Sequence, residues 1–185
     1  MTDIKFNIAR IVLCTETEGP FKRLAIWFQG CDKRCPGCCN AELLEIKKAN
    51  VMLLEEVIKI IKDSKKINKI EGVTFLGGEP TLQLGLASLA TEIRNLDLGI
   101  ILFTGKLLSE LKDDLINSMD LIIDGEFDIN EIDNQRNLIG SSNQIIYYMT
   151  NRYKKHTEWF LNKRQKTTDI NITSSNLYIN GDVIN

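Results

Sequence analysis

Apolar residues in this chain fall into short continuous runs that alternate with longer amphipathic segments. The short runs predict strands at residues 24–29, 70–78, 98–105, 120–125 and 143–150. The amphipathic segments repeat apolar residues at helical spacing opposite a charged face, and they predict helices at residues 53–66, 81–96 and 106–119. The polar segment 128–138 is expected to form a loop.

Strands that are apolar throughout and separated by helices indicate βα units. We therefore predict the α/β class, with a parallel sheet whose outer face is covered by helices. The pattern weakens after residue 150, where we expect a basic helix at 152–166 and a small hairpin at 177–184 that turns at Asn180-Gly181. The predicted domains are a core at residues 1–150 and a C-terminal extension at 151–185 packed on the same domain.

Polar or conformationally special residues follow the predicted strands at their carboxyl ends. They are the cysteine-rich segment 30–40, the tetrapeptide Gly77-Gly78-Glu79-Pro80, and the pairs Thr104-Gly105 and Asp124-Gly125. Ligands of parallel α/β proteins meet the carboxyl ends of the strands. We therefore expect these segments to lie around one site.

Composition narrows the class of protein. The chain has 185 residues, a net charge of −2 and 43% hydrophobic residues, which together favour one globular domain. The bulk charge does not point to nucleic acid, and no apolar run is long enough to indicate a membrane span. We expect a soluble cytoplasmic protein, in which clustered thiols bind metal or act in catalysis more often than they form disulfides.

The segment GCDKRCPGCCN holds four of the five cysteines of the chain. Cys31, Cys35 and Cys38 follow a C-x3-C-x2-C spacing, which lets one loop place three thiolates around an iron–sulfur cube. Such cubes normally take four cysteine ligands, so three would leave one iron open to bind another molecule. Gly30 and Gly37 permit the backbone to bend around a bulky group.

Two other interpretations of these cysteines stay open. A structural zinc site would use Cys31, Cys35 and Cys38 with either Cys39 or Cys14, although zinc sites usually draw on two separated ligand pairs. Alternatively, the thiols would be reduced residues of the core, against which the adjacent charged residues argue. We expect Cys39 to pack behind the cluster and Cys14 to be structural.

Two motifs together resemble the signature of a known superfamily. C-x3-C-x2-C early in the chain, followed after the next predicted strand by FLGGEP, is similar to the signature of radical S-adenosylmethionine enzymes. The resemblance implies a partial, open βα barrel. It also implies one 4Fe-4S cluster held by Cys31, Cys35 and Cys38, and S-adenosylmethionine as the second cofactor.

Longer segments resemble one group within that superfamily, the activating enzymes of anaerobic ribonucleotide reductase. These segments are GPFKRLAIWFQGCDKRCPGCCN, LIIDGEF and LIGSSNQIIYYM, and they extend over residues 19–149. The chain has Cys39 where an aromatic residue often follows the third ligand, Glu79 where some members have aspartate, and Ile139 where an arginine often stands. The tail from Asn151 onward has no recognised counterpart.

The resemblance also implies a mechanism and roles for residues. The open iron would chelate S-adenosylmethionine, and one electron would cleave it to methionine and a 5′-deoxyadenosyl radical. Gly77, Gly78 and Glu79 would hold the methionine ammonium, with Pro80 beginning the next helix. Further cofactor-binding candidates are Thr104, Gly105, Asp124, Ser141, Ser142, Asn143 and Gln144, for which an ordinary turn or a self-capped loop is the alternative. No side chain is assigned as catalytic.

The small size of the chain favours a protein substrate that reaches into an open site. We therefore expect an activase that abstracts hydrogen from a glycine in a large glycyl-radical-type partner subunit. The expected electron donor is a protein such as flavodoxin or ferredoxin. The alternatives are a radical enzyme acting on a small molecule, as the carboxy-deazaguanine synthases do, or on a ribosomal peptide, and a non-enzymatic module stabilised by zinc or a cluster. Arg23 and Arg34 are candidates to face an anion, a partner surface or solvent.

Overall fold

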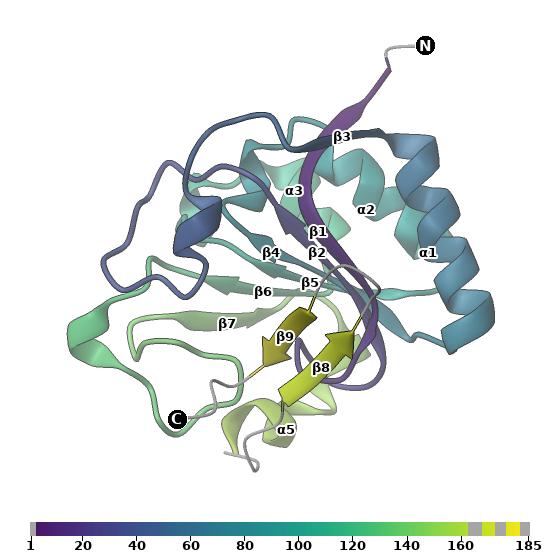
Figure 1. The fold of residues 1–185 in the computed structure, drawn as a ribbon. Coiled ribbons are helices and arrows are strands. Elements are labelled where there is room, and N and C mark those ends of the chain that lie inside the picture. The colour runs from purple at the N-terminus through teal and green to yellow at the C-terminus, as the bar shows by residue number, and fades with distance from the viewer. Residues whose placement is uncertain (1–2, 163–167, 173–176, 182–185) are drawn as a thin grey trace.

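The computed structural model describes residues 3–162, 168–172 and 177–181, which are built around an open seven-stranded sheet (Figure 1). The strand order is β3-β1-β2-β4-β5-β6-β7. The strands of this sheet are Lys5–Thr15 (β1), Arg23–Phe28 (β2), Asn50–Leu53 (β3), Gly72–Gly77 (β4), Gly99–Phe103 (β5), Leu121–Asp124 (β6) and Ile145–Tyr148 (β7). Helices Leu54–Asn68 (α1), Leu86–Asn95 (α2) and Asp113–Ser118 (α3) cover one face, as Figure 1 shows. The predicted α/β class, open sheet and helix-covered face are confirmed.

The centre of the sheet is parallel. Strands β2, β4, β5 and β6 are parallel neighbours, with Phe28 opposite Gly77 and Phe103 opposite Ile123. Their carboxyl ends therefore reach the same edge of the sheet, where the predicted site residues follow.

The outer strands run antiparallel to their neighbours. β1 pairs antiparallel with β2 and β3, and β7 pairs antiparallel with β6. The expectation that residues 143–150 continue the parallel sheet is therefore wrong. A parallel return needs a crossover, usually a helix, whereas the connection from β6 to β7 contains only the 3₁₀ turn Ile129–Glu131 (η4).

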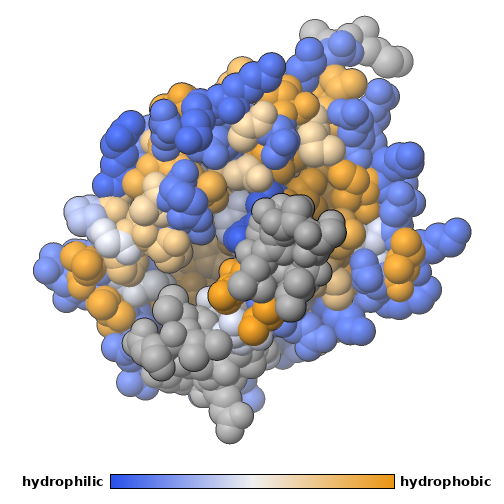
Figure 2. All heavy atoms as spheres, viewed as in Figure 1, coloured by the Kyte–Doolittle hydropathy of each residue, from blue (hydrophilic) through white to orange (hydrophobic). Residues whose placement is uncertain are grey.

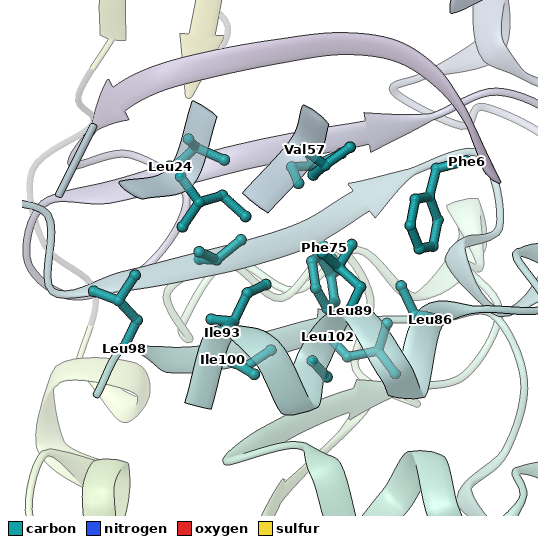
Figure 3. Close-up of a cluster of buried hydrophobic side chains, with 14 of the residues drawn as sticks. Phe6, Leu24, Val57, Phe75, Leu86, Leu89, Ile93, Leu98, Ile100 and Leu102 are labelled. Carbon is teal, nitrogen blue, oxygen red and sulfur yellow. The ribbon is translucent and has the colours of Figure 1, made fainter. Parts of the chain in front are cut away.

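The main hydrophobic core lies between the parallel strands and the helices (Figure 3). Leu24 on β2, Phe75 on β4 and Leu102 on β5 point toward the helices and are fully buried. Val57 on α1 and Leu89 on α2 belong to the same buried cluster. Burial of such side chains stabilises the fold by about 1.5–3 kcal/mol each.

Two predicted helices are shorter than their sequence pattern. In residues 81–96 only α2 is α-helical, because Pro80–Leu82 forms a separate 3₁₀ turn (η2) and Gly85 begins α2 at the N-cap. In residues 106–119 only α3 is α-helical, preceded by the 3₁₀ turn Leu108–Glu110 (η3). The side chain of Glu110 accepts a hydrogen bond from the Leu107 N–H group, which caps the start of the η3 turn.

The opposite face of the sheet is closed at its amino end by a buried arginine. Arg23 is fully buried, so it faces neither a partner surface nor solvent. Its Nε atom donates to Thr74 Oγ1 at 2.6 Å, and its terminal nitrogens donate to Tyr153 Oη at 2.6 Å and to the Val73 carbonyl at 2.7 Å. Each of these contacts gives a buried polar group a hydrogen-bond partner. Together they join Arg23 on β2 to β4 and to Tyr153 of the C-terminal segment.

The C-terminal segment is a pair of short helices followed by a hairpin. The basic helix expected at 152–166 is instead split into Asn151–Lys154 (α4) and Thr157–Leu161 (α5), and residues 163–167 lie outside the described part. Phe160 of α5 packs on the second face of the sheet with Ile101. Strands Thr168–Ile172 (β8) and Leu177–Gly181 (β9) pair antiparallel.

The expected hairpin turn at Asn180-Gly181 is wrong, because both residues belong to β9 and pair with the first residues of β8. Residues 182–184 of the expected hairpin lie outside the described part. Among the described residues, none of the helices combines the length and apolar character that a membrane span requires.

The two buried tyrosine hydroxyls provide a matched test of the arginine network. We expect Tyr153→Phe to lower the free energy of unfolding by about 1.5–3 kcal/mol, because it removes a hydrogen bond to a buried charged group. Tyr148→Phe is the control, since the buried Tyr148 hydroxyl has no hydrogen-bond partner among the described residues. Urea denaturation of both variants measures the difference, and an equal loss in both would contradict the assigned role of Arg23.

Candidate functional site

The cysteine loop leaves the carboxyl end of β2 and is closed at its base by backbone hydrogen bonds. The N–H groups of Gly30 and Cys31 donate to the carbonyls of Leu43 and Leu44, at 2.9 and 3.1 Å. The side chain of Gln29 adds a hydrogen bond to the Glu45 carbonyl at 2.7 Å. The intervening residues therefore project as one closed loop at the edge of the sheet.

The tip of the loop requires a glycine. Gly37 has φ of 75°, in the left-handed region that other residues rarely adopt. A Cβ atom at this position would also lie 2.6 Å from Ile129 Cδ1, on the segment that follows β6. The bend between the second and third predicted ligands thus depends on the glycine that the sequence analysis singled out.

The three predicted ligands lie on this loop in different environments. Cys31 is buried, while Cys35 and Cys38 are half-buried. Backbone N–H groups point at two of the sulfurs: Lys33 N lies 3.4 Å from Cys31 Sγ, and Asn40 N lies 3.4 Å from Cys38 Sγ. Hydrogen bonds to ligand sulfurs are among the features that tune iron–sulfur clusters.

The thiol of Cys39 acts on its neighbour. Hydrogen bonding from Cys39 and from the Asn40 N–H group lowers the pKa of Cys38 to about 6. This shift favours the thiolate of Cys38, the form that binds metal. Cys39 is exposed, and its expected place behind the cluster stays a prediction. Cys14 lies on β1 against the main core, as expected of a structural cysteine.

The donor set consists of three thiols on one loop, and thiolates are the ligands that iron–sulfur clusters take. Among the described residues, no group of three or more His, Cys, Asp and Glu side chains is arranged to hold one metal ion. Burial is the main cause of the raised pKa of Cys35, and the nearby charges of Glu126, Cys38 and Cys31 add to it.

The GGEP segment packs directly against the start of the cysteine loop. Gly78 N donates to the Phe28 carbonyl at 2.9 Å, and Glu79 N donates to the Gly30 carbonyl at 2.8 Å. A Cβ atom on Gly78 would lie only 2.1 Å from Gly30 O. The second glycine of the motif is therefore required by the close approach of two backbones. Pro80 begins the η2 turn, as predicted for the start of a helical segment.

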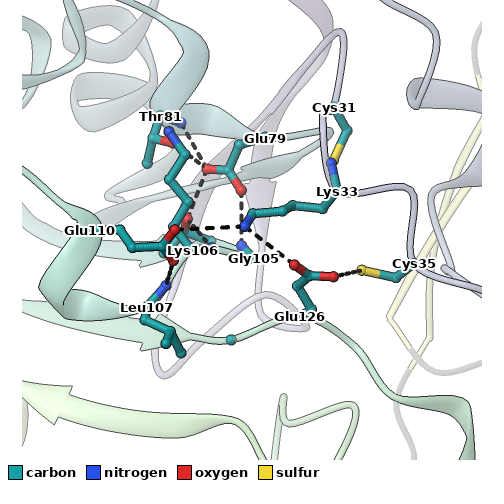
Figure 4. Close-up of polar contacts among 12 residues, drawn as sticks. Cys31, Lys33, Cys35, Glu79, Thr81, Gly105, Lys106, Leu107, Glu110 and Glu126 are labelled. Carbon is teal, nitrogen blue, oxygen red and sulfur yellow. Dashed lines mark hydrogen bonds and ion pairs between the residues drawn. The ribbon is translucent and has the colours of Figure 1, made fainter.

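The carboxylate of Glu79 joins the ends of β4 and β5 (Figure 4). Glu79 is 1% exposed. Its Oε1 atom accepts from Thr104 Oγ1 at 2.8 Å and from Thr81 Oγ1 at 2.7 Å, and its Oε2 atom accepts from Gly105 N at 2.9 Å. The structure thus brings together the predicted residues Glu79, Thr104 and Gly105.

Asp124 lies on the helix-covered side of the sheet. Ile122, two residues earlier on β6, packs in the core beneath the helices, and the alternation of a strand puts Asp124 on the same side. Its Oδ2 atom accepts from Leu108 N at 2.7 Å. The Oδ1 atom is buried without a hydrogen-bond partner among the described residues. Asp124 therefore supports the η3 turn, and its proposed contact with a cofactor stays a prediction.

The polar run from Ser141 to Gln144 holds the segment that follows β6. Asn143 Nδ2 donates to the Glu126 carbonyl at 2.8 Å, and Gln144 Nε2 donates to the Gly125 carbonyl at 3.0 Å. Ser141 Oγ accepts from Asp128 N at 3.0 Å, and Ser142 Oγ donates to the carboxylate of Glu131 at 2.6 Å. These side chains are engaged with the protein itself, so a direct role near the adenosyl group stays a prediction.

Sequence reasoning missed three residues of the site. Lys33 extends from the cysteine loop across Gly105 and forms an ion pair with Glu126 at 3.2 Å (Figure 4). Arg136 donates to the carbonyls of Gln144 and Ser142, at 2.9 and 3.0 Å. Lys33 stands between two predicted ligands, and Glu126 follows Asp124-Gly125. Both residues could therefore have been predicted as site candidates from their sequence neighbours.

Figure 2 shows the molecule from the same side as Figure 1, with a recess below the upper rim of hydrophilic side chains. Hydrophobic and hydrophilic residues both line what can be seen of the recess.

Comparisons with known proteins agree with this arrangement. A family model described as a 4Fe-4S single cluster domain matches residues 17–147. The anaerobic ribonucleoside-triphosphate reductase-activating protein of Vibrio cholerae serotype O1 is 30% identical over 141 residues, which are 71% of this chain and 91% of the relative. The protein of the same name from Enterobacteria phage T4 is 26% identical over 156 residues, which are 81% of this chain and 99% of the relative.

Among solved structures, that of QueE from Escherichia coli matches 55% of this chain and 52% of its own, with 18% identity and a TM-score of 0.46. The match to the cluster domain and the similarity to the curated relatives each extend over most of the chain. The chain therefore belongs to the 4Fe-4S single cluster domain family and, within it, to the anaerobic ribonucleoside-triphosphate reductase-activating proteins.

Proposed function

We propose that this protein is a radical S-adenosylmethionine enzyme that activates an anaerobic ribonucleotide reductase by generating a glycyl radical in it. The observation that carries the proposal is the contact between the three-cysteine loop and the GGEP segment at the ends of β2 and β4. The names of the relatives, which cover most of this chain, support the choice of substrate protein.

We assign the cluster to Cys31, Cys35 and Cys38. Soft thiolate ligands are those that iron–sulfur clusters take. The lowered pKa of Cys38 and the N–H groups directed at Cys31 and Cys38 prepare these sulfurs for that role. When bound and reduced, such a cluster supplies the electron that cleaves S-adenosylmethionine to methionine and a 5′-deoxyadenosyl radical.

The structure refines the role expected of Glu79. Its two carboxylate oxygens already accept hydrogen bonds from Thr81, Thr104 and Gly105. We therefore assign Glu79 the task of holding Thr104-Gly105 beside the GGEP backbone. We assign binding of the methionine ammonium to the backbone of Gly77 and Gly78, at the end of β4.

The partner is proposed to insert a glycine-bearing segment into the open face. The sheet does not close into a complete barrel, so a protein segment has a route to the strand ends. An electron donor such as flavodoxin or ferredoxin is proposed to reduce the cluster from outside. Action in the cytoplasm, without nucleic acid or membrane as partner, stays part of the same proposal.

Five cysteines allow a direct test of ligand assignment. We expect Cys31→Ala, Cys35→Ala and Cys38→Ala each to lose most of the bound iron and sulfide after anaerobic reconstitution, since each removes a cluster ligand. Cys14→Ala and Cys39→Ala are the controls and are expected to keep one cluster per chain. Full cluster content in any of the first three variants would contradict the assignment of that residue.

Glu79→Gln tests the positioning role of the carboxylate. The variant keeps all three cysteines, so we expect normal cluster content. Affinity for S-adenosylmethionine is expected to fall about tenfold or more, because hydrogen bonds to a charged group are worth about 1.5–3 kcal/mol and tenfold corresponds to about 1.4 kcal/mol. Calorimetric titration measures this, with Glu92→Gln on the exposed face of α2 as control. Unchanged affinity for S-adenosylmethionine would contradict the positioning role assigned to Glu79.

The activase function itself is tested with a partner. The protein, reductant and S-adenosylmethionine are incubated anaerobically with the anaerobic ribonucleotide reductase of the same organism. We expect the electron paramagnetic resonance doublet of a glycyl radical on the reductase, together with methionine and 5′-deoxyadenosine. Formation of 5′-deoxyadenosine without a protein radical would favour a small molecule or a peptide as substrate and would contradict the proposal.

A further inference from the structure

A lysine lies inside the cysteine loop, between two of the predicted ligands. The stem of Lys33 crosses Gly105 so closely that a Cβ atom there would lie 3.0 Å from Lys33 Cγ. Its ammonium lies 3.2 Å from Glu126 Oε1 and 4.0 Å from Glu110 Oε1. The Lys33 side chain is 19% exposed, so this cation is held at the site (Figure 4).

Glu126 connects that lysine to a predicted cluster ligand. Its Oε1 atom meets Lys33, and its Oε2 atom lies 4.0 Å from Cys35 Sγ. The protonated thiol donates a weak S–H hydrogen bond to it, and a cluster-bound thiolate would keep only the proximity. The backbone carbonyl of Glu126 accepts from Asn143 Nδ2 at 2.8 Å. The backbone from which this carboxylate extends is therefore held by the Ser-Ser-Asn-Gln segment.

The two charges have opposite effects on a cluster held by Cys35. Reduction adds one negative charge, and the reduction potential of iron–sulfur clusters depends on the charge around them. The carboxylate of Glu126 disfavours that added charge, and the ammonium of Lys33 favours it. Glu126 is half exposed, so both effects are partly screened by solvent and salt.

We propose that Lys33 and Glu126 form a compensating charge pair beside the cluster, in which each charge offsets the shift that the other would impose on the reduction potential, with the Glu126 backbone held by Asn143. The proposal rests on the proposed function, because it takes Cys35 as a cluster ligand. It gives the Ser-Ser-Asn-Gln segment an effect on electron acceptance, exerted through Glu126.

The test is the reduction potential of the reconstituted protein without S-adenosylmethionine, followed by electron paramagnetic resonance. Lys33→Met is expected to lower the potential, because it leaves Glu126 uncompensated. Glu126→Gln is expected to raise it. Each shift should change the ratio of reduced to oxidised cluster at a fixed applied potential by up to about tenfold, which is about 59 mV for a one-electron couple. The double variant should return close to the wild-type value.

A second ion pair provides the matched control. Lys47 and Glu45 lie 2.8 Å apart just beyond the loop, and both side chains are more exposed than half. Lys47→Met and Glu45→Gln are expected to leave the potential unchanged. If the Glu126→Gln variant does not hold a cluster, the Lys33→Met variant alone still tests the inference. Its shift in reduction potential must become smaller between 0.1 and 1 M salt, because the Debye length falls from about 10 Å to about 3 Å.

Shifts of the same sign in both single variants, or equal potentials in all cluster-loaded proteins, would overturn this inference alone. A wild-type protein that takes up no cluster would overturn the proposed function and the inference with it.

Discussion

The close approach between the end of β4 and the start of the cysteine loop is the constraint on which the site depends. A side chain on Gly78 would collide with the Gly30 carbonyl, to which the next residue donates its N–H group. Because these two backbones touch, the loop that carries the thiols is fixed to the segment proposed to hold the methionine group. Glu79 extends the connection to Thr104-Gly105 on β5. Three neighbouring strand ends thus become one rigid edge.

The two faces of the sheet serve different needs. The helix-covered face holds the main core and supplies most of the burial that stabilises the fold. The other face is closed at its amino end by Arg23 and Tyr153, far along the strands from the cysteine loop. The proposed reaction site lies at the carboxyl edge of the sheet. The loops there are held by hydrogen bonds to one another, as Asn143 and Gln144 hold the segment after β6. Charges such as Lys33 and Glu126 can then act at fixed positions.

Much of this arrangement could be predicted from the sequence, and the exceptions have physical causes. The central strands were recognisable because both faces are buried, which makes the runs apolar throughout. The direction of β7 was missed because periodicity carries no information on orientation. The motif spacing singled out Cys31, Cys35 and Cys38, whose role as ligands stays a prediction. The close backbone approach expected at Gly78 is present. The contact between Lys33 and Glu126 joins residues far apart in sequence, so only the fold reveals it.

The most direct test of this account is the electron paramagnetic resonance spectrum of the reconstituted, reduced protein, recorded anaerobically with and without S-adenosylmethionine. Three cysteine ligands leave one iron open, so the account predicts a 4Fe-4S signal that changes when S-adenosylmethionine is added. A cluster signal that S-adenosylmethionine leaves unchanged would contradict the open iron. The absence of any cluster signal would contradict the assignment of Cys31, Cys35 and Cys38 and would return these thiols to a zinc site or to a structural role.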